Sequence, residues 1–149
     1  RIVEEAIMKS PSVKNYKREK TILNSRFDFV GIDSTDRHFV LEVKTVPLCV
    51  EDGVAFFPHG YRKKKGDPVS PRALKHLNDL IEISQGSDAE AIMCYVIQRG
   101  DADQFIPSDT DSIYKAKFYE AKEKNVTIKT VFVRWERDGS CFSQKITNF

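Results

Sequence analysis

The feature that most limits the fold of this chain is residues 91–97, AIMCYVI, a short run that is almost entirely apolar. A run of this length bounded by polar residues suits a β-strand, and a strand without polar alternation is buried on both faces. Strands of this kind lie in sheets whose faces are covered by helices. We therefore expect an α/β fold built around this strand.

Helical and strand patterns on both sides of the run complete the expected order. The predicted elements are a helix over 2–8, strands over 16–23, 26–32 and 38–46, a helix over 70–86, the buried strand, a helix over 111–124, a strand over 127–135 and an edge strand over 141–146. Ser70-Pro71 is a strong helix start, because serine caps the first turn and proline occupies it. The order predicts a mixed β-sheet flanked by helices.

Length and composition restrict the class of protein further. A chain of 149 residues supports one domain, and 40% hydrophobic residues give it a core, which excludes collagen-like, low-complexity and wholly disordered proteins. No apolar run approaches the roughly 18 residues that cross a bilayer. The three cysteines form no CxxC motif and are expected to be reduced thiols, without a disulfide or zinc. We expect an intracellular protein, in the cytoplasm or in an organelle or nucleus, that does not associate with a membrane.

Charged side chains on two neighbouring predicted strands are the candidates for chemistry. Asp28 lies in SRFDF, and Glu42 and Lys44 lie in LEVK, where strand alternation puts both on one face and Val43 in the core. If the hairpin sets Asp28 opposite Glu42, the two carboxylates need a hard divalent cation between them, Mg²⁺ or Mn²⁺. Lys44 would then orient or deprotonate a water and stabilise a phosphoryl transition state. An ordinary ion pair on an exposed strand is the alternative that these residues leave open.

A basic run stands ahead of the long predicted helix. Its members are consecutive: Arg62, Lys63, Lys64 and Lys65. Such a cluster can bind phosphate groups, and it can equally be a solvated loop that serves solubility. The net charge of +2 does not decide between these readings.

Five segments in order resemble the carboxy-terminal nuclease-like domain of the sugar fermentation stimulation protein (SfsA) family. They are RIVEEAI, SRFDF, LEVKTVPL, GDPVSPRALKHLNDL, and the final stretch AIMCYVIQR with DQFIPSDTDSIYKAKFYEAKEKNVTI. The resemblance implies a restriction-endonuclease-like (PD-(D/E)XK) fold with an α-β-β-β-α-β core. It also implies a divalent-metal site and nucleic-acid binding, with DNA as the first expectation. The family's amino-terminal barrel domain of the OB type is not represented in these 149 residues, which we expect to form a single domain.

The resemblance also assigns roles to individual residues. Asp28 and Glu42 match the metal-binding carboxylates, Lys44 matches the catalytic lysine, and Glu5 matches an acidic residue of the first helix that reaches the metal directly or through water. Phosphate contacts are expected from polar residues at the entrance to the long helix. Those residues are Asp67, Arg72, Lys75 and His76. Gln98 matches a polar position at the end of the buried strand, and the alternative is an amide that only ends the strand.

Two departures from the family pattern leave alternatives open. An apparent insertion over residues 59–66 makes the match at Asp67 ambiguous, because His59 can take the same place. Ala73 stands where the family prefers glycine, at the start of the helix. The expected function is a Mg²⁺- or Mn²⁺-dependent nuclease. The alternative is a non-catalytic DNA-binding or structural module of the same fold within a larger assembly.

Overall fold

The computed structural model describes residues 2–46, 50–51, 53–58, 69–98, 102–135 and 141–149. Its main feature is a six-stranded sheet with the strand order β1-β2-β3-β6-β8-β9. The strands are β1 (Val13–Ile22), β2 (Ser25–Asp33), β3 (His38–Val46), β6 (Glu90–Ile97), β8 (Thr127–Trp135) and β9 (Cys141–Asn148). The three central strands, β3, β6 and β8, are parallel, and the outer pairs are antiparallel. The predicted mixed sheet is thus confirmed.

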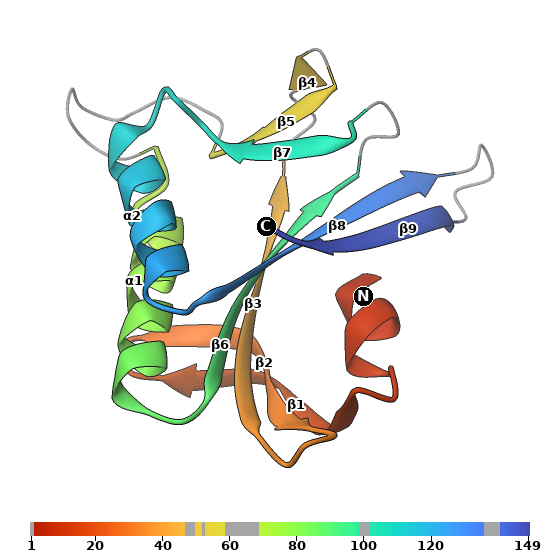
Figure 1. Cartoon of the computed structure of the whole chain (residues 1–149), viewed down its shortest axis with the longest axis vertical. Coiled ribbons are helices and arrows are strands. Elements are labelled where there is room, and N and C mark those ends of the chain that lie inside the picture. The colour runs from red at the N-terminus through yellow and green to blue at the C-terminus, as the bar shows by residue number, and fades with distance from the viewer. Residues whose placement is uncertain (1, 47–49, 52, 59–68, 99–101, 136–140) are drawn as a thin grey trace.

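The apolar run is buried on both faces, as its composition predicts. Alternate side chains of β6 belong to two separate hydrophobic cores, with Met93 and Tyr95 in one and Cys94 and Val96 in the other. The first core packs under α1 (Pro71–Gly86) and α2 (Ser112–Glu123), on one side of the sheet in Figure 1. The second packs under the amino-terminal helix, whose residues Glu4–Met8 form the π-helical element η1. We call these two sides the α1 face and the η1 face.

Both long helices begin at residues that cap them. Ser70 Oγ accepts a hydrogen bond from Ala73 N at 3.2 Å, and Pro71 is the first helical residue of α1. Asp111 Oδ1 accepts from Tyr114 N at 3.0 Å at the start of α2. Because its apolar positions repeat at helical spacing, α1 lies flat on the sheet with Leu77 and Leu80 fully buried. This places the first turns of α1 beside the carboxyl end of β3.

A second, three-stranded sheet was not expected from the sequence. It consists of β4 (Val50–Glu51), β5 (Val54–Phe57) and β7 (Gln104–Pro107), in the order β4-β5-β7. The strands are too short to show a two-residue period, and β5 pairs with β7 across a long stretch of sequence. This small sheet extends the core of the α1 face through Ala55, Phe57 and Phe105.

The remaining predicted boundaries hold within a few residues. Strand β1 begins three residues before its predicted start, at Val13, and β9 continues past its predicted end to Asn148. No helix in the described part of the chain is long and apolar enough to cross a membrane.

Candidate active site

The site forms where β2 and β3 separate. Their antiparallel pairing runs from Ile32 and His38 to Phe29 and Leu41 and then stops. One step further, the register puts Asp28 opposite Glu42. Instead of backbone pairing at this step, Asp28 Oδ2 accepts a hydrogen bond from Val43 N at 2.7 Å. The carboxylate of Asp28 thereby takes the place of a backbone acceptor between β2 and β3, and it is fixed beside Glu42.

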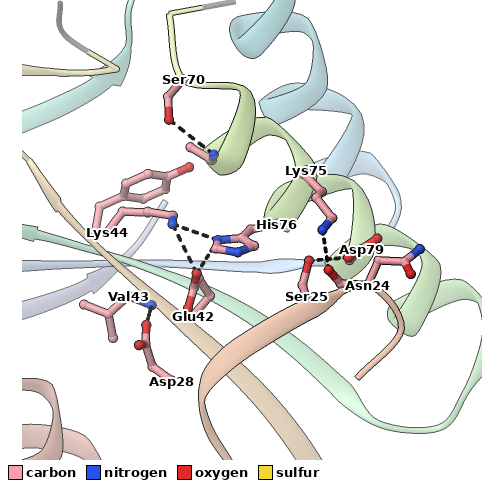
Figure 2. A network of polar contacts seen from close by, with 12 residues as sticks. Asn24, Ser25, Asp28, Glu42, Val43, Lys44, Ser70, Lys75, His76 and Asp79 are labelled. Carbon is pink, nitrogen blue, oxygen red and sulfur yellow. Dashed lines mark hydrogen bonds and ion pairs between the residues drawn. The ribbon is translucent and has the colours of Figure 1, made fainter. Parts of the chain in front are cut away.

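Glu42 is the centre of a polar cluster on the α1 face (Figure 2). Its side chain is only 4% exposed, and its Oε2 accepts a hydrogen bond from Lys44 Nζ at 3.1 Å. The same oxygen is in very short contact with His76 Nδ1, which reaches it from the second turn of α1. Lys44 Nζ also lies 2.8 Å from His76 Nδ1. One group from β3 and one from α1 therefore meet at a single buried carboxylate oxygen.

The hydrogen on His76 Nδ1 determines how this cluster is bonded. A buried carboxylate needs donors, so the short contact places a hydrogen on Nδ1 that is donated to Glu42. Lys44 then donates to the same carboxylate. The imidazole lies against the ring of Phe27, with the ring centroids 6.1 Å apart, which holds it in this orientation. His76 is thus a structural partner of Glu42.

The two carboxylates have opposite pKa shifts. Burial alone would raise the pKa of Glu42, but hydrogen bonds from His76 and Asp28 and the charge of Lys44 outweigh it and lower the pKa to about 2. Burial and the hydrogen bond with Glu42 raise the pKa of Asp28 to about 7, against the lowering effect of Val43 N. Glu42 therefore carries the negative charge, while Asp28 is mainly protonated below pH 7 in the absence of a cation.

A polar cavity of about 310 Å³ opens above these groups. It is lined by Glu19, Arg26, Phe27, Asp28, Glu42, Val43, Lys44 and Arg72. Arg72 is an exposed residue of the first turn of α1, and Arg26 pairs with Glu19 across the β1–β2 hairpin at 2.9 Å. The cavity thus combines three carboxylates with three cationic side chains.

A second cavity, of about 540 Å³, lies on the η1 face and shares three lining residues with the first: Glu19, Asp28 and Val43. The backbone is irregular here, because Glu19 has a positive φ of 56° and forms no ladder pair with Asp28. The irregularity also interrupts side-chain alternation in β2. Phe27 packs in the core of the α1 face and Phe29 in that of the η1 face.

The structure brings some of the predicted site residues together and not others. Asp28, Glu42, Lys44 and Arg72 line one cavity. His76 is 4% exposed and is bonded to Glu42 in the interior. Lys75 is exposed and donates a hydrogen bond to the carbonyl of Asn24.

Glu5 is not brought to this group. It lies on η1, across the sheet from Glu42, and forms an exposed ion pair with Lys9 at 2.9 Å. Its neighbour Glu4 faces the sheet, where it accepts a hydrogen bond from Tyr16 at 3.1 Å. The predictions at His59, Arg62, Lys63, Lys64, Lys65 and Asp67 lie outside the described residues.

Sequence reasoning missed Arg26 and Glu19 as members of the cavity. Both come from the β1–β2 hairpin, next to Asp28 in space. Arg26 stands two residues before Asp28, on the same side of an alternating strand, and this spacing is a signal that was available. No comparable signal marks Glu19, because it depends on the positive φ of that residue.

Comparisons with known proteins agree with the motifs. Residues 1–139 match the family model described as the sugar fermentation stimulation protein RE domain. A sugar fermentation stimulation protein homolog of Acetivibrio thermocellus is 37% identical over 134 residues, which cover 86% of this chain and 53% of the relative. A homolog of Crocosphaera subtropica is 40% identical over 106 residues, covering 70% of this chain and 40% of the relative. The chain spans about half the length of the curated relatives it matches.

A solved structure has the same fold. Pyrococcus furiosus SfsA in complex with Ca²⁺ superposes with a TM-score of 0.73 and 22% sequence identity. The match covers 99% of this chain and 58% of the other. Nearly the whole fold described above is therefore shared with one part of a longer protein.

Proposed function

Since the chain belongs to the sugar fermentation stimulation protein family, we propose that its site hydrolyses phosphodiester bonds of nucleic acid with Mg²⁺ or Mn²⁺ as cofactor. The observation that carries the proposal is the meeting of Asp28 and Glu42 where the sheet separates, with Lys44 Nζ 3.1 Å from Glu42 Oε2. Carboxylates in contact, a fixed ammonium and nearby arginines are the groups that this reaction requires.

The donor set fits a hard divalent cation. Among the described residues, no group of three or more His, Cys, Asp or Glu side chains is placed to hold a metal ion. Mg²⁺ commonly binds through one or two carboxylates and completes its coordination with water and substrate phosphate oxygens. Asp28 and Glu42 would hold the cation in this way. The Ca²⁺ in the Pyrococcus furiosus SfsA structure supports the proposal, because Ca²⁺ is also an oxygen-seeking divalent cation.

Each side chain of the cavity has a distinct task in the proposed reaction. When bound, the cation neutralises phosphate charge and lowers the pKa of a coordinated water. Lys44 donates to the oxygen on which negative charge develops, and it is held for this by Glu42. Arg72 and Arg26 bind phosphates of the substrate on either side of the reacting group. We propose that the basic run at Arg62, Lys63, Lys64 and Lys65 adds further phosphate contacts.

The metal site is tested by thermal unfolding in Mn²⁺. A ligand at a hundred times its Kd stabilises a protein by about 2.7 kcal/mol, or several degrees in Tm for a domain of this size. We expect this shift in the wild type and its loss in Asp28→Asn. Asp36→Asn is the matched control, because Asp36 is exposed in the β2–β3 turn and its positive φ suits asparagine.

Cleavage is tested separately, with end-labelled single- and double-stranded DNA and RNA of one sequence. Hydrolysis that needs Mn²⁺ or Mg²⁺ and disappears in Asp28→Asn supports the nuclease. A protein that binds the metal and the oligonucleotides but cleaves none of them is the non-catalytic module of the alternative. An unchanged Tm in millimolar Mn²⁺, together with no cleavage, contradicts the proposal.

A further inference from the structure

The cavity on the η1 face has no role in the chemistry described so far. Its volume of about 540 Å³ is within the range of pockets that enclose an organic ligand. It lies directly behind Asp28, which lines both cavities. A molecule in this cavity would therefore be adjacent to a phosphate bound at Asp28 and Glu42.

The lining combines buried apolar residues with polar ones. Val3, Phe29 and Val96 belong to the buried core of the η1 face and supply the apolar part of the lining. Arg18, Thr45 and Gln98 are the polar lining residues that this cavity does not share with the first. In the described part of the chain, the side chains of Thr45 and Gln98 form no hydrogen bond with another residue. An amide and a hydroxyl group are thus left to bond a ligand.

We propose that this cavity is a nucleobase subsite, which receives the base of one unpaired nucleotide while the adjoining phosphate lies at Asp28. The inference rests on the proposed function and specifies its substrate class. A base has a flat apolar surface for the apolar part of the lining and an edge of donors and acceptors, which the amide of Gln98 can match with both of its groups. Arg18 is exposed and lines the same cavity, so it would bind the next phosphate of the strand.

A base can occupy this subsite only if its nucleotide is unpaired. A base within a duplex is stacked on its neighbours and its pairing edge is occupied, so it can enter a pocket only when it is single-stranded or turned out of the helix. The first cavity opens on the α1 face and the second on the η1 face, and both include Asp28. A strand at Asp28 thus directs a base away from its pairing partner. The substrate class is single-stranded or locally unpaired nucleic acid.

The test compares oligonucleotides of equal charge with and without bases. A thymidine decamer and an abasic decamer are titrated in Mg²⁺ with the Lys44→Met protein, so that neither is cleaved, and binding is followed by fluorescence anisotropy. We expect Gln98→Leu to weaken binding of the thymidine decamer about 5- to 10-fold and to leave the abasic decamer unchanged. Gln104→Leu, at an exposed position of β7, is the matched control and should change neither.

Thr45→Val provides a second variant at an exposed position, so that a folding defect of Gln98→Leu does not decide the outcome. Equal effects on the two decamers, or no effect of either variant, overturn the subsite while leaving the proposed function standing. Binding of a fully paired duplex that is as tight and as sensitive to Gln98→Leu also overturns it. Failure of every oligonucleotide to bind removes both the subsite and the proposed function.

Discussion

The two sides of the sheet at Asp28 differ in how their polar side chains are held. On the α1 face, Glu42 and His76 are about 95% buried and bonded to each other, and Lys44 also donates to Glu42. On the η1 face, Thr45 and Gln98 line a larger cavity without hydrogen bonds to other described residues. The first arrangement fixes charges in advance, and the second leaves donors and acceptors for a ligand.

This difference corresponds to the requirements of chemistry and of recognition. Groups that stabilise a transition state are effective only when they are already oriented, because orienting them during the reaction would cost free energy. Groups that recognise a ligand must be able to exchange water for that ligand. Asp28 belongs to both sides, since it is bonded to Val43 N and lines both cavities. Separate substitutions on the two faces can therefore test whether the roles are distinct.

The largest effect is expected from Lys44→Met, which keeps the length of the side chain and removes its charge. The loss of a preorganised charge in the transition state should lower kcat by about 1000-fold and leave binding of Mn²⁺ and nucleic acid within a few-fold of the wild type. Single-turnover cleavage and anisotropy titrations measure the two quantities. Cleavage at the wild-type rate would show that Lys44 does not take part in the reaction.

The second prediction concerns His76 and the stability of the α1 face. Replacing it with leucine leaves the buried Glu42 without one of its donors, which should lower the free energy of unfolding by about 1.5 to 3 kcal/mol. His76→Asn carries an amide nitrogen close to the place of Nδ1 and should recover at least half of the loss. Urea denaturation in EDTA measures both variants.

Gln98→Leu is the control from the other face for this prediction. Because the amide of Gln98 is not bonded within the described structure, its removal should change the free energy of unfolding by less than about 0.5 kcal/mol. Equal stabilities of His76→Leu and His76→Asn would mean that packing against Phe27, and not the hydrogen bond, is what His76 contributes.

Local sequence patterns were sufficient to predict the α1 face in outline. Alternation in LEVK placed Glu42 and Lys44 on one face, and the Ser70-Pro71 signal fixed the start of α1. The approach of Asp28 to Glu42 needs only the register of the β2–β3 hairpin, and a four-residue turn determines that register. Strand alternation, the helix cap and the hairpin register each depend on residues that are close together in the chain or on paired strands. Such features can therefore be predicted from the sequence.

The features that were missed depend on contacts between distant segments. The bond between Glu42 and His76 requires the crossing of α1 over β3, which no spacing in the sequence specifies. The cavity on the η1 face is lined in part by Glu19, which has a positive φ that a glutamate in the sequence gives no reason to expect. The exposed position of Glu5 depends on how the first helix turns on the sheet.

A smaller effect is expected in the pH dependence of the metal-free protein. Folding raises the pKa of Asp28 from 3.8 to about 7, so between these values the native state binds a proton that the unfolded state does not. The contribution of Asp28 to stability is therefore present below pH 4 and is lost as the pH rises to 7. Because Asp28 is only half-buried, we expect about 1 to 2 kcal/mol after solvent screening.

The matched variant is Asp28→Asn, which has no proton to lose. Its free energy of unfolding in EDTA should lack the decline between pH 4 and 7. Glu42 acts in the opposite direction, because its pKa falls to about 2 and its contribution is lost only as the pH drops below 4.5. Denaturant titrations at several pH values separate the two carboxylates. Identical slopes for wild type and Asp28→Asn would show that Asp28 is ionised throughout this range.

The smallest effect is expected from Arg72→Ala, which removes one proposed phosphate contact at the edge of the α1-face cavity. A phosphate contact carries no sequence information, so binding should weaken a few-fold for the thymidine and abasic decamers alike. The slope of log K against log salt should decrease by about 0.7, the value for one contact on a single strand.

Arg37→Ala is the control, because Arg37 is an exposed arginine beyond the opposite end of β3 that pairs with Glu90. Titrations at four salt concentrations distinguish the two variants. A slope for Arg72→Ala that equals the wild-type and Arg37→Ala slopes would place the phosphate backbone away from the start of α1, although Asp28 and Glu42 would still mark the reacting centre.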